Sequence, residues 1–370
     1  MMKQIQTYII LSAMVLFIAP GCRQPPEPER IDIAKTLSST QETHCFDKAD
    51  APISIEFPRD QGSHDSFKTE WWYYTGNLKT DLDRHFGYQL TFFRQALSCE
   101  PISGTSKWRT RQVYFAHFAL TDTKGDSFYS DSRMNRQSLN IAGTTAHPFR
   151  VWIDDWQVKQ AGEDLVLFAK TDSISLSLKL TAEKQAVLQG NRGLSRKGPK
   201  PYNSSYYYSI PRLDTKGTLL MGCEEYELKG KTWFDHEWST SVLGDEIKGW
   251  DWFSVHFEDG RDLMVCKIRR SDGTPNGYGF GSLVHGDGTY EILSEKDFSI
   301  RAISHWRSPA TGNRYPSLWE IKLPDYKIAL TVTPVVENQE HNHMLAYWEG
   351  AARFVGKEIR GLGYIELTGY

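Results

Sequence analysis

Short stretches in which apolar and polar residues alternate recur along most of the chain. Aromatic and β-branched residues dominate these stretches, and turn residues such as those at 258–260 separate them. A period of two predicts strands, and no long segment of the sequence shows a clear helical period. The predicted strands cover residues 71–78, 86–94, 113–121, 173–180, 206–213, 251–257, 262–269 and 327–332. The pattern therefore predicts an all-β protein built of barrels or sandwiches.

Two of the predicted hairpins resemble each other. Residues 71–94 and residues 250–269 each contain an aromatic strand, a turn and a second strand that ends on arginine. The offset of 179 residues (250 − 71) is typical of a duplicated domain rather than of a solenoid repeat. We therefore expect two domains, at 51–240 and 241–370, and a chance similarity of two hairpins is the alternative.

The N-terminus has the features of an export signal. Lys3 precedes an apolar run at 8–18, which is shorter than the roughly 20 residues of a membrane-spanning helix. Cys22 follows Gly21 as in the lipobox of bacterial lipoproteins, and Arg23 follows it in turn. We expect a signal peptide at 1–21, and a lipidated Cys22 with a Pro-rich tether at 22–50. An ordinary signal peptide that is cut nearby is the alternative.

This N-terminus predicts where the protein works. We expect an exported protein, either an outer-membrane lipoprotein that faces the periplasm or a secreted one. Its lipid anchor would make the membrane a partner. If Cys22 is lipidated, Cys45, Cys99, Cys223 and Cys266 remain, and four cysteines allow three disulfide pairings.

The composition excludes several classes of function. The 370 residues include 12 Trp, 18 Tyr and 18 Phe, which is 13% aromatic and needs an explanation. Lys and Arg total 43 against 46 Asp and Glu, so the net charge is −3. A chain so near neutrality is not expected to bind nucleic acid. The cysteine spacings do not form a zinc site, and we predict neither a metal nor a cofactor.

Polar residues interrupt several aromatic strands. If side chains alternate along the strand at 233–238, His236 shares one face with Phe234 and Trp238. In the strand at 250–257, Asp251 likewise shares a face with apolar residues. Each such group has a structural interpretation, in which it hydrogen-bonds neighbouring strands. Several together favour an apolar ligand cavity with a few polar groups. The predicted substrate-binding residues are Glu70, Trp72, Tyr74, Gln89, His117, Trp238 and Trp252.

Longer motifs carry a resemblance to a known family. They are Phe57-Pro58-Arg59-Asp60, Thr69-Glu70-Trp71-Trp72-Tyr73-Tyr74-Thr75-Gly76, and the stretches 86–94, 206–213, 235–238, 249–253, 347–350 and 363–370. With these motifs the chain resembles the carotenoid 1,2-hydratase/AttH family of lipocalin-like proteins, over nearly all of residues 55–370. The resemblance implies two tandem lipocalin-like (calycin-type) antiparallel β-barrels. Members are often labelled predicted secreted hydrolases or carotenoid hydratases.

The family resemblance implies a chemistry. In the hydratases a His-x-Trp pair and a downstream Asp form the proposed acid–base set, which His236, Trp238 and Asp251 match. The position two before Asp251 is Gly249, where the hydratases have Tyr. Hydration of a C=C bond needs a neutral carboxylic acid in a dry pocket and aromatic faces for the cation.

Two functions follow from this chemistry. One is a hydro-lyase or hydrolase that acts on an isoprenoid-like or other lipid substrate, with Asp251 as the catalytic acid and His236 as base or orienter. The other is a carrier that binds a lipophilic ligand without chemistry, as barrels with apolar interiors commonly do.

Overall fold

The computed structural model describes residues 44–100, 103–240, 243–244, 246–343 and 346–370. The chain divides into residues 1–30 and 31–370, and every described residue belongs to the second part. The predicted signal peptide and Cys22 therefore lie outside the described residues. Among the residues that the model describes, no helix has the length and hydrophobicity of a membrane span.

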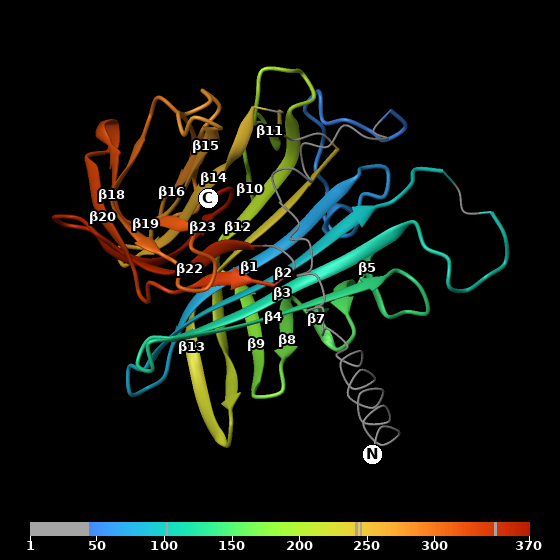
Figure 1. Cartoon of the computed structure of the whole chain (residues 1–370), viewed down its shortest axis with the longest axis horizontal. Coiled ribbons are helices and arrows are strands. Elements are labelled where there is room, and N and C mark those ends of the chain that lie inside the picture. The colour runs from blue at the N-terminus through green and yellow to red at the C-terminus, as the bar shows by residue number, and fades with distance from the viewer. Residues whose placement is uncertain (1–43, 101–102, 241–242, 245, 344–345) are drawn as a thin grey trace, which may run out of the picture. The chain divides into compact units, whose positions relative to one another are not determined.

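The first sheet curls into a nearly closed antiparallel barrel (Figure 1). Its main strands follow the order β4-β3-β2-β1-β13-β12-β9-β8-β7-β6-β5. Their bounds are β1 (Thr69–Lys79), β2 (His85–Ala96), β3 (Gln112–Asp122), β4 (Ser127–Arg136), β5 (Ala142–Ala146), β6 (Phe149–Ile153), β7 (Trp156–Ala161), β8 (Asp164–Lys170), β9 (Ile174–Ala182), β12 (Ser204–Met221) and β13 (Glu224–Ser239). The short strands β10 (Val187–Leu188) and β11 (Leu194–Arg196) also pair with β12. Phe118 of β3 contacts Trp156 of β7 across the interior, with ring centroids 5.7 Å apart, so the two ends of the sheet share one core.

The second sheet is a curled half-barrel of the order β17-β16-β15-β14-β23-β22-β20-β19-β18. Its strands are β14 (Ile247–Phe257), β15 (Asp262–Arg270), β16 (Phe280–Val284), β17 (Tyr290–Ser294), β18 (Ser299–Arg307), β19 (Arg314–Leu323), β20 (Ile328–Pro334), β22 (Ala346–Val355) and β23 (Arg360–Leu367), and β21 (Glu340–Asn342) pairs with β22. Phe253, Trp319 and Trp348 lie in its apolar core, so each sheet encloses a core of its own.

The structure confirms the predicted all-β fold of two lipocalin-like sheets. Each of the eight predicted strands is present, and the helices in the described residues are two short 3-10 turns, η1 (Arg59–Gln61) and η2 (Pro324–Tyr326). β12 runs on to Met221, beyond the predicted end at Leu213. A bulge between Ile210 and Leu213 interrupts its pairing with β13, and the strand then continues between β9 and β13. Two partners thus extend a strand whose local sequence signal ends at the bulge.

The outer faces of the two sheets pack against each other. Tyr73 and Trp233 of the first sheet lie in one buried cluster with Trp252, Met264 and other residues of the second. Polar contacts also cross the junction: the side-chain amide of Asn77 donates to the carbonyl of Gly363 at 3.0 Å. Because strand side chains alternate, each of these strands buries both faces, one in its own core and one at the junction.

The two similar hairpins meet at this junction. β1 pairs with β2, and β14 pairs with β15, in each case antiparallel. Trp71 and Trp250, which occupy matching places in the two hairpins, both point to the junction and line one cavity there. The two hairpins that are similar in sequence thus also occupy equivalent positions at the junction, one in each sheet.

One disulfide ties the N-terminal segment to the first barrel. Cys45 is bonded to Cys99, whereas Cys223 is an exposed thiol and Cys266 a buried one. The structure therefore selects one bond where sequence spacing allowed three arrangements. The segment between Cys45 and β1 is also hydrogen-bonded to the barrel, because the indole of Trp72 donates to the carbonyl of Gln61 at 3.0 Å.

Candidate functional site

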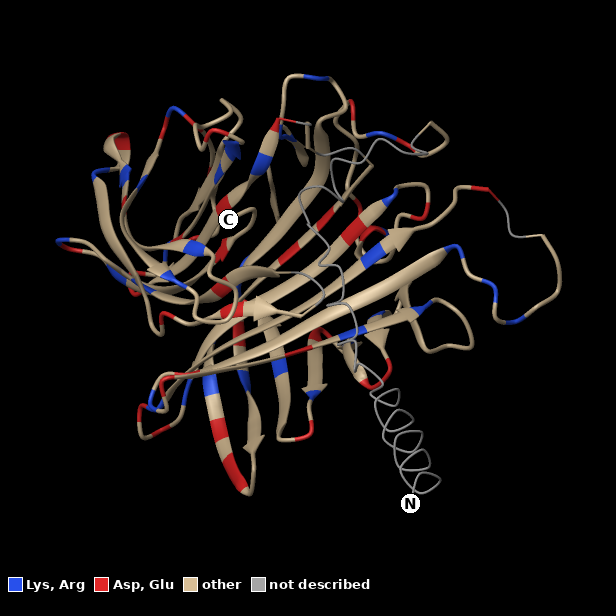
Figure 2. Ribbon diagram, in the orientation of Figure 1, with Lys and Arg blue, Asp and Glu red and all other residues tan. Residues whose placement is uncertain are grey.

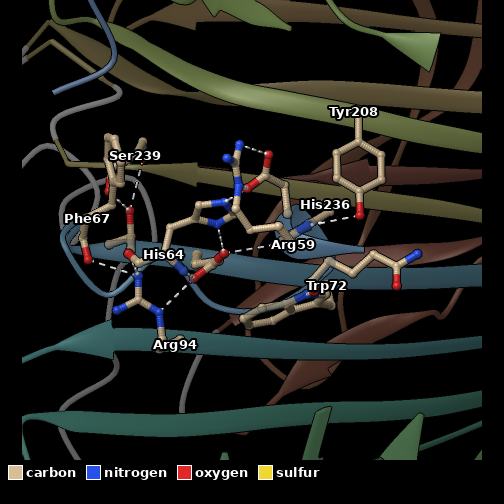
Figure 3. A network of polar contacts seen from close by, with 12 residues as sticks. Arg59, His64, Phe67, Trp72, Arg94, Tyr208, His236 and Ser239 are labelled. Carbon is tan, nitrogen blue, oxygen red and sulfur yellow. Dashed lines mark hydrogen bonds and ion pairs between the residues drawn. The ribbon is translucent and has the colours of Figure 1, made fainter. Parts of the chain in front are cut away.

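A buried polar network lies inside the first barrel (Figure 3). Glu70 is its centre. Its Oε1 lies 2.7 Å from Nδ1 of His64 and 2.9 Å from Nε2 of His236, and its Oε2 accepts a bond from Nε of Arg94 at 2.8 Å. β1 supplies Glu70, and its neighbours β2 and β13 supply Arg94 and His236. The expected aromatic surroundings are present, since the ring of His236 stacks on Trp72 with centroids 4.8 Å apart.

Electrostatics make Glu70 an anion. Burial alone would raise its pKa, but the charges of Arg94 and His64 hold that pKa well below the ordinary range. Burial lowers the pKa of His64, but the charges and hydrogen bonds of Glu70 and Asp60 outweigh it and raise the pKa to about 9. Burial lowers the pKa of His236. The network is therefore an ionised Glu70 held between the cations of Arg94 and His64, with a neutral His236 beside it.

The same three side chains have the spacing of metal ligands. Donor atoms of His64, Glu70 and His236 lie within 4.8 Å of one another, and two imidazoles with one carboxylate can bind zinc. However, Arg94 already occupies the second oxygen of Glu70, and His64 holds a proton where a metal would bind. The charge of Glu70 is thus balanced without a metal, which favours a structural role for this network.

We expect His64 to make stability depend on pH. Its folded-state pKa of about 9 exceeds the unfolded value of 6.5. The stabilisation is therefore fully present below pH 6.5 and is lost as pH rises through about 9, with a size on the order of 3 kcal/mol. His64→Gln should destabilise the protein by this amount at low pH and by much less above pH 9. Urea unfolding across this range measures the effect, and His285→Gln, in an exposed ion pair with Glu291, is the control. An equal loss for His64→Gln at every pH would contradict this account.

His236 and Asp251 face different interiors. His236 lies in the core of the first barrel, whereas Asp251 points into the core side of the second sheet, on the same face as Phe253. There the carboxylate accepts bonds from Nε of Arg269 at 2.8 Å and from the hydroxyl of Tyr370 at 2.7 Å. Arg269 and Tyr370 thus engage the carboxyl group of Asp251. The structure does not bring the two residues together as a catalytic pair, and their catalytic roles stay predictions.

A cavity of about 380 Å³ lies between the two sheets. Aromatic side chains form much of its wall, from both of the similar hairpins: Trp71, Tyr73, Phe93, Trp250 and Trp252. Two predicted substrate-binding residues, Glu70 and Trp252, line this space. Apolar walls of this extent suit a lipophilic ligand.

Two carboxyl groups of the second sheet face the cavity. Glu349 of β22 and Glu366 of β23 are direct partners in the antiparallel register, so they leave the sheet on the same side. Burial raises the pKa of Glu366 to about 8, and burial followed by the charge of Glu366 raises that of Glu349 well above its ordinary range. Two adjacent buried carboxyl groups cannot both ionise readily, so this pair is largely neutral at pH 7.

Glu349 has the less satisfied carboxyl group of the two. Within the described residues, neither of its oxygens accepts a hydrogen bond of good geometry. The phenols of Tyr73 and Tyr347 are near enough to moderate its pKa, although they do not reach that geometry. Glu366 is half-buried and borders the cavity. A neutral acid that no well-formed hydrogen bond holds can donate its proton into the cavity.

Asp235 is the third carboxyl group, and it belongs to the first barrel. It accepts bonds from the hydroxyl of Tyr207 and the indole of Trp233, both at 2.8 Å, and from Ser209. Burial raises its pKa to about 7, and the three donors limit the rise. Because β1 pairs with β13, Asp235 lies beside Tyr73, which in turn lies near Glu349. The cavity thus holds a group that ionises near neutral pH and another that stays neutral.

The other predicted residues divide between the two interiors. Trp72, Tyr74 and Trp238 lie in the core of the first barrel with the Glu70 network. Gln89 of β2 and His117 of β3 lie on the opposite face of the first sheet, which faces the junction. His117 contacts the cavity through Tyr347, whose hydroxyl lies 2.8 Å from its Nδ1. Burial lowers the pKa of His117 to about 3, so this imidazole is neutral.

Sequence reasoning missed the carboxyl groups of the cavity. Asp235 and Glu237 flank His236, and Glu349 and Glu366 lie in the motifs at 347–350 and 363–370. The available signal was the alternation itself, which puts the residues beside His236 on the opposite face. That face reads as solvent-exposed until a second sheet is known to cover it.

Comparison with known proteins identifies the family. The model of the AttH-like family matches residues 48–370. This chain belongs to the AttH-like family. The crystal structure of an AttH candidate from Nitrosomonas europaea is 32% identical, with a TM-score of 0.77 over 86% of this chain and 99% of that chain. No functionally curated protein sequence matches the chain.

A second solved structure shares the AttH-like fold. Kievitone hydratase from Nectria haematococca is 15% identical, with a TM-score of 0.66 over 92% of this chain and 98% of that chain. At this identity the likeness concerns the fold. Both comparisons extend over both sheets, so the tandem arrangement is a property of the fold and the cavity lies at its junction.

Proposed function

We propose that this AttH-like protein is a hydratase that adds water to a C=C bond of a lipophilic substrate in the cavity between the two sheets. The observation that carries the proposal is the pair Glu349 and Glu366, two adjacent buried carboxyl groups on an aromatic-walled cavity. Hydration of an unactivated alkene begins with protonation of carbon, which needs a neutral acid away from water. The name of kievitone hydratase, a protein of the same fold, is consistent with this reaction.

The residues of the cavity can complete the reaction. Glu349 transfers its proton to one alkene carbon and becomes a carboxylate. The other carbon becomes a cation, which the faces of Trp71, Trp250 and Trp252 can stabilise. A water oxygen bonds to that carbon, and ionised Asp235 takes a proton from it. The alkene has then gained one water molecule, and a proton passes back from Asp235 to Glu349 before the next cycle.

Export is a second part of the proposal. The bond between Cys45 and Cys99 supports a compartment outside the cytoplasm, because structural disulfides persist in oxidising surroundings. The lipid anchor at Cys22 and the membrane as a partner stay predictions. A mass shift of the N-terminal fragment after growth with a labelled fatty acid tests the anchor.

Product analysis in heavy-oxygen water tests the proposed activity. The purified protein is incubated in H₂¹⁸O with kievitone and with prenylated or other lipophilic alkenes, and products are separated by chromatography with mass spectrometry. The proposal expects a product that has gained one water with the heavy isotope. An alkene that binds tightly and is recovered unchanged would contradict hydration and favour the alternative of a carrier.

The pH dependence of the rate reports on Asp235. Its carboxylate must be ionised to accept the proton of water, so kcat/KM is expected to rise with pH through about 7. Ser209→Ala removes a hydrogen bond that favours the ionised form, and it should move this rise to higher pH. Asp235→Asn should abolish the rise. A rate that falls through pH 7 in the wild type would contradict the role of Asp235 as a base.

A further inference from the structure

An exposed apolar corner lies where β2 ends and β3 begins. Leu97, at the end of β2, is 54% exposed, and Met134 of β4 is 55% exposed. The backbone amide of Leu97 donates to the carbonyl of Arg111 at 2.7 Å, which holds the end of β2 beside the start of β3. Met134 of β4 is the register partner of Phe115 of β3, so the three strands are neighbours here. Single exposed apolar residues are common, but these belong to one continuous surface.

This corner is the outer end of the cavity. Leu97 and Met134 line the cavity, and so do Phe93 and Phe115, whose rings stack with centroids 4.7 Å apart. The apolar wall between the sheets therefore continues outward along β2, β3 and β4 to the surface. The wall is mostly apolar, with Gln95 between Phe93 and Leu97 on the same face.

The loop beyond the corner carries an aromatic residue among basic ones. Trp108 is 61% exposed, and Arg136 of β4 donates to its backbone carbonyl at 3.3 Å, which holds this part of the loop against the corner. The described part of the loop holds the basic residues Lys107, Arg109 and Arg111 and one acidic residue, Glu100. Figure 2 shows these basic segments on the loop between β2 and β3, at the right of the view.

We infer that this surface, Leu97, Trp108 and Met134 with the basic residues around them, docks on an anionic lipid bilayer. Tryptophan and lysine or arginine side chains are the groups that protein surfaces use at the boundary between headgroups and acyl chains. Basic residues attract anionic headgroups, while the apolar side chains enter the acyl region. Docking would place the mouth of the cavity at the bilayer, from which a lipophilic ligand enters. The inference concerns binding only and does not depend on the hydration chemistry.

The opposite end of the same strands offers a matched control. Leu82, in the turn between β1 and β2, is 94% exposed, more than Trp108. Its neighbours Asp81 and Asp83 are ion-paired with Lys229 and Lys79, so their charges are balanced and the turn has no excess of basic residues to attract anionic lipid. Exposed hydrophobicity alone would favour Leu82, whereas the combination of apolar and basic groups favours the Trp108 loop.

Spin labels on the full chain test the docking. Cys22→Ser and Cys223→Ser remove other reactive thiols, and a nitroxide is attached after Trp108→Cys or after Leu82→Cys. With vesicles of phosphatidylcholine and phosphatidylglycerol, the label at 108 should become protected from a water-soluble relaxation agent and accessible to oxygen. The label at 82 should stay in water, whether or not the N-terminus holds the chain on the vesicle.

Charge substitutions complete the test. Lys107→Gln with Arg109→Gln should raise the lipid concentration for half-maximal protection of the label at 108 by about 30-fold. Lys124→Gln, an exposed residue of the turn between β3 and β4, should leave it unchanged. Full exposure of the label at 108 to water on anionic vesicles would overturn the inference. Protection that appears without vesicles would also overturn it, since a protein surface would then cover the loop.

Discussion

Replacing Glu349 by glutamine is expected to lower the hydration rate by about 10³-fold while the protein stays folded. Glutamine keeps the shape of a neutral glutamic acid but has no acidic proton. Since Glu349 is buried, lines the cavity and has no well-formed hydrogen bond among the described residues, the substitution breaks few contacts. The loss should therefore appear in kcat rather than in KM.

Stability measurements separate this effect from damage to the fold. Burial raises the pKa of Glu349 above its unfolded value of 4.5. The contribution of this group to stability is therefore fully present below that value and is lost as pH rises through the folded-state pKa. Glu349→Gln should lose less stability at high pH than the wild type. Glu358→Gln, an exposed residue of the turn that joins β22 to β23, should change neither rate nor stability. Full activity of Glu349→Gln would remove this residue from the mechanism.

Replacing Arg94 by methionine is expected to destabilise the first barrel by about 3–5 kcal/mol. Arg94 and Glu70 both have fully buried side chains, so the substitution removes one of the two cations that balance the Glu70 carboxylate in the core and leaves only His64. Arg94 also donates to the carbonyls of His64 and Phe67, each at 2.9 Å, and these acceptors would lose their partner. Equilibrium unfolding in urea, followed by tryptophan fluorescence, measures the loss.

The exposed pair Lys79–Asp83 provides the comparison for Arg94. Its atoms are as close, at 2.7 Å, but the side chains are 44% and 80% exposed. Lys79→Met should therefore cost much less stability than Arg94→Met. Similar losses for Lys79→Met and Arg94→Met would contradict the importance of burial. A second variant, Glu70→Gln, should recover part of the stability that Arg94→Met loses, because it removes the buried carboxylate that has lost Arg94.

The alternation of the sequence was sufficient to predict the strands but not their surroundings. It correctly grouped Phe234, His236 and Trp238 on one face of β13, and the structure places them in one interior. It could not indicate that the other face, with Asp235, is covered by a second sheet. Such coverage depends on contacts between residues far apart in the chain, which a local period does not encode.

Asp251 was predicted to be the catalytic acid because its partner on the neighbouring strand is not visible in the sequence. An aspartate on an apolar face must be neutral or paired, and the sequence offered no choice between these outcomes. The structure shows a pair, with Arg269 of the adjacent strand β15. Burial raises the pKa of both Glu349 and Glu366, which lie in motifs that carry the family resemblance. Their proximity depends on the register between β22 and β23.

Infrared difference spectroscopy of the carboxyl groups tests the central claim most directly. The claim is that the cavity between the sheets holds a carboxylic acid that stays protonated at neutral pH. The account predicts a C=O stretch of protonated carboxyl at pH 7 in the wild type that decreases with an apparent pKa near 8 and weakens in Glu349→Gln and Glu366→Gln. A wild-type spectrum in which every carboxyl group is already ionised at pH 7 would contradict it.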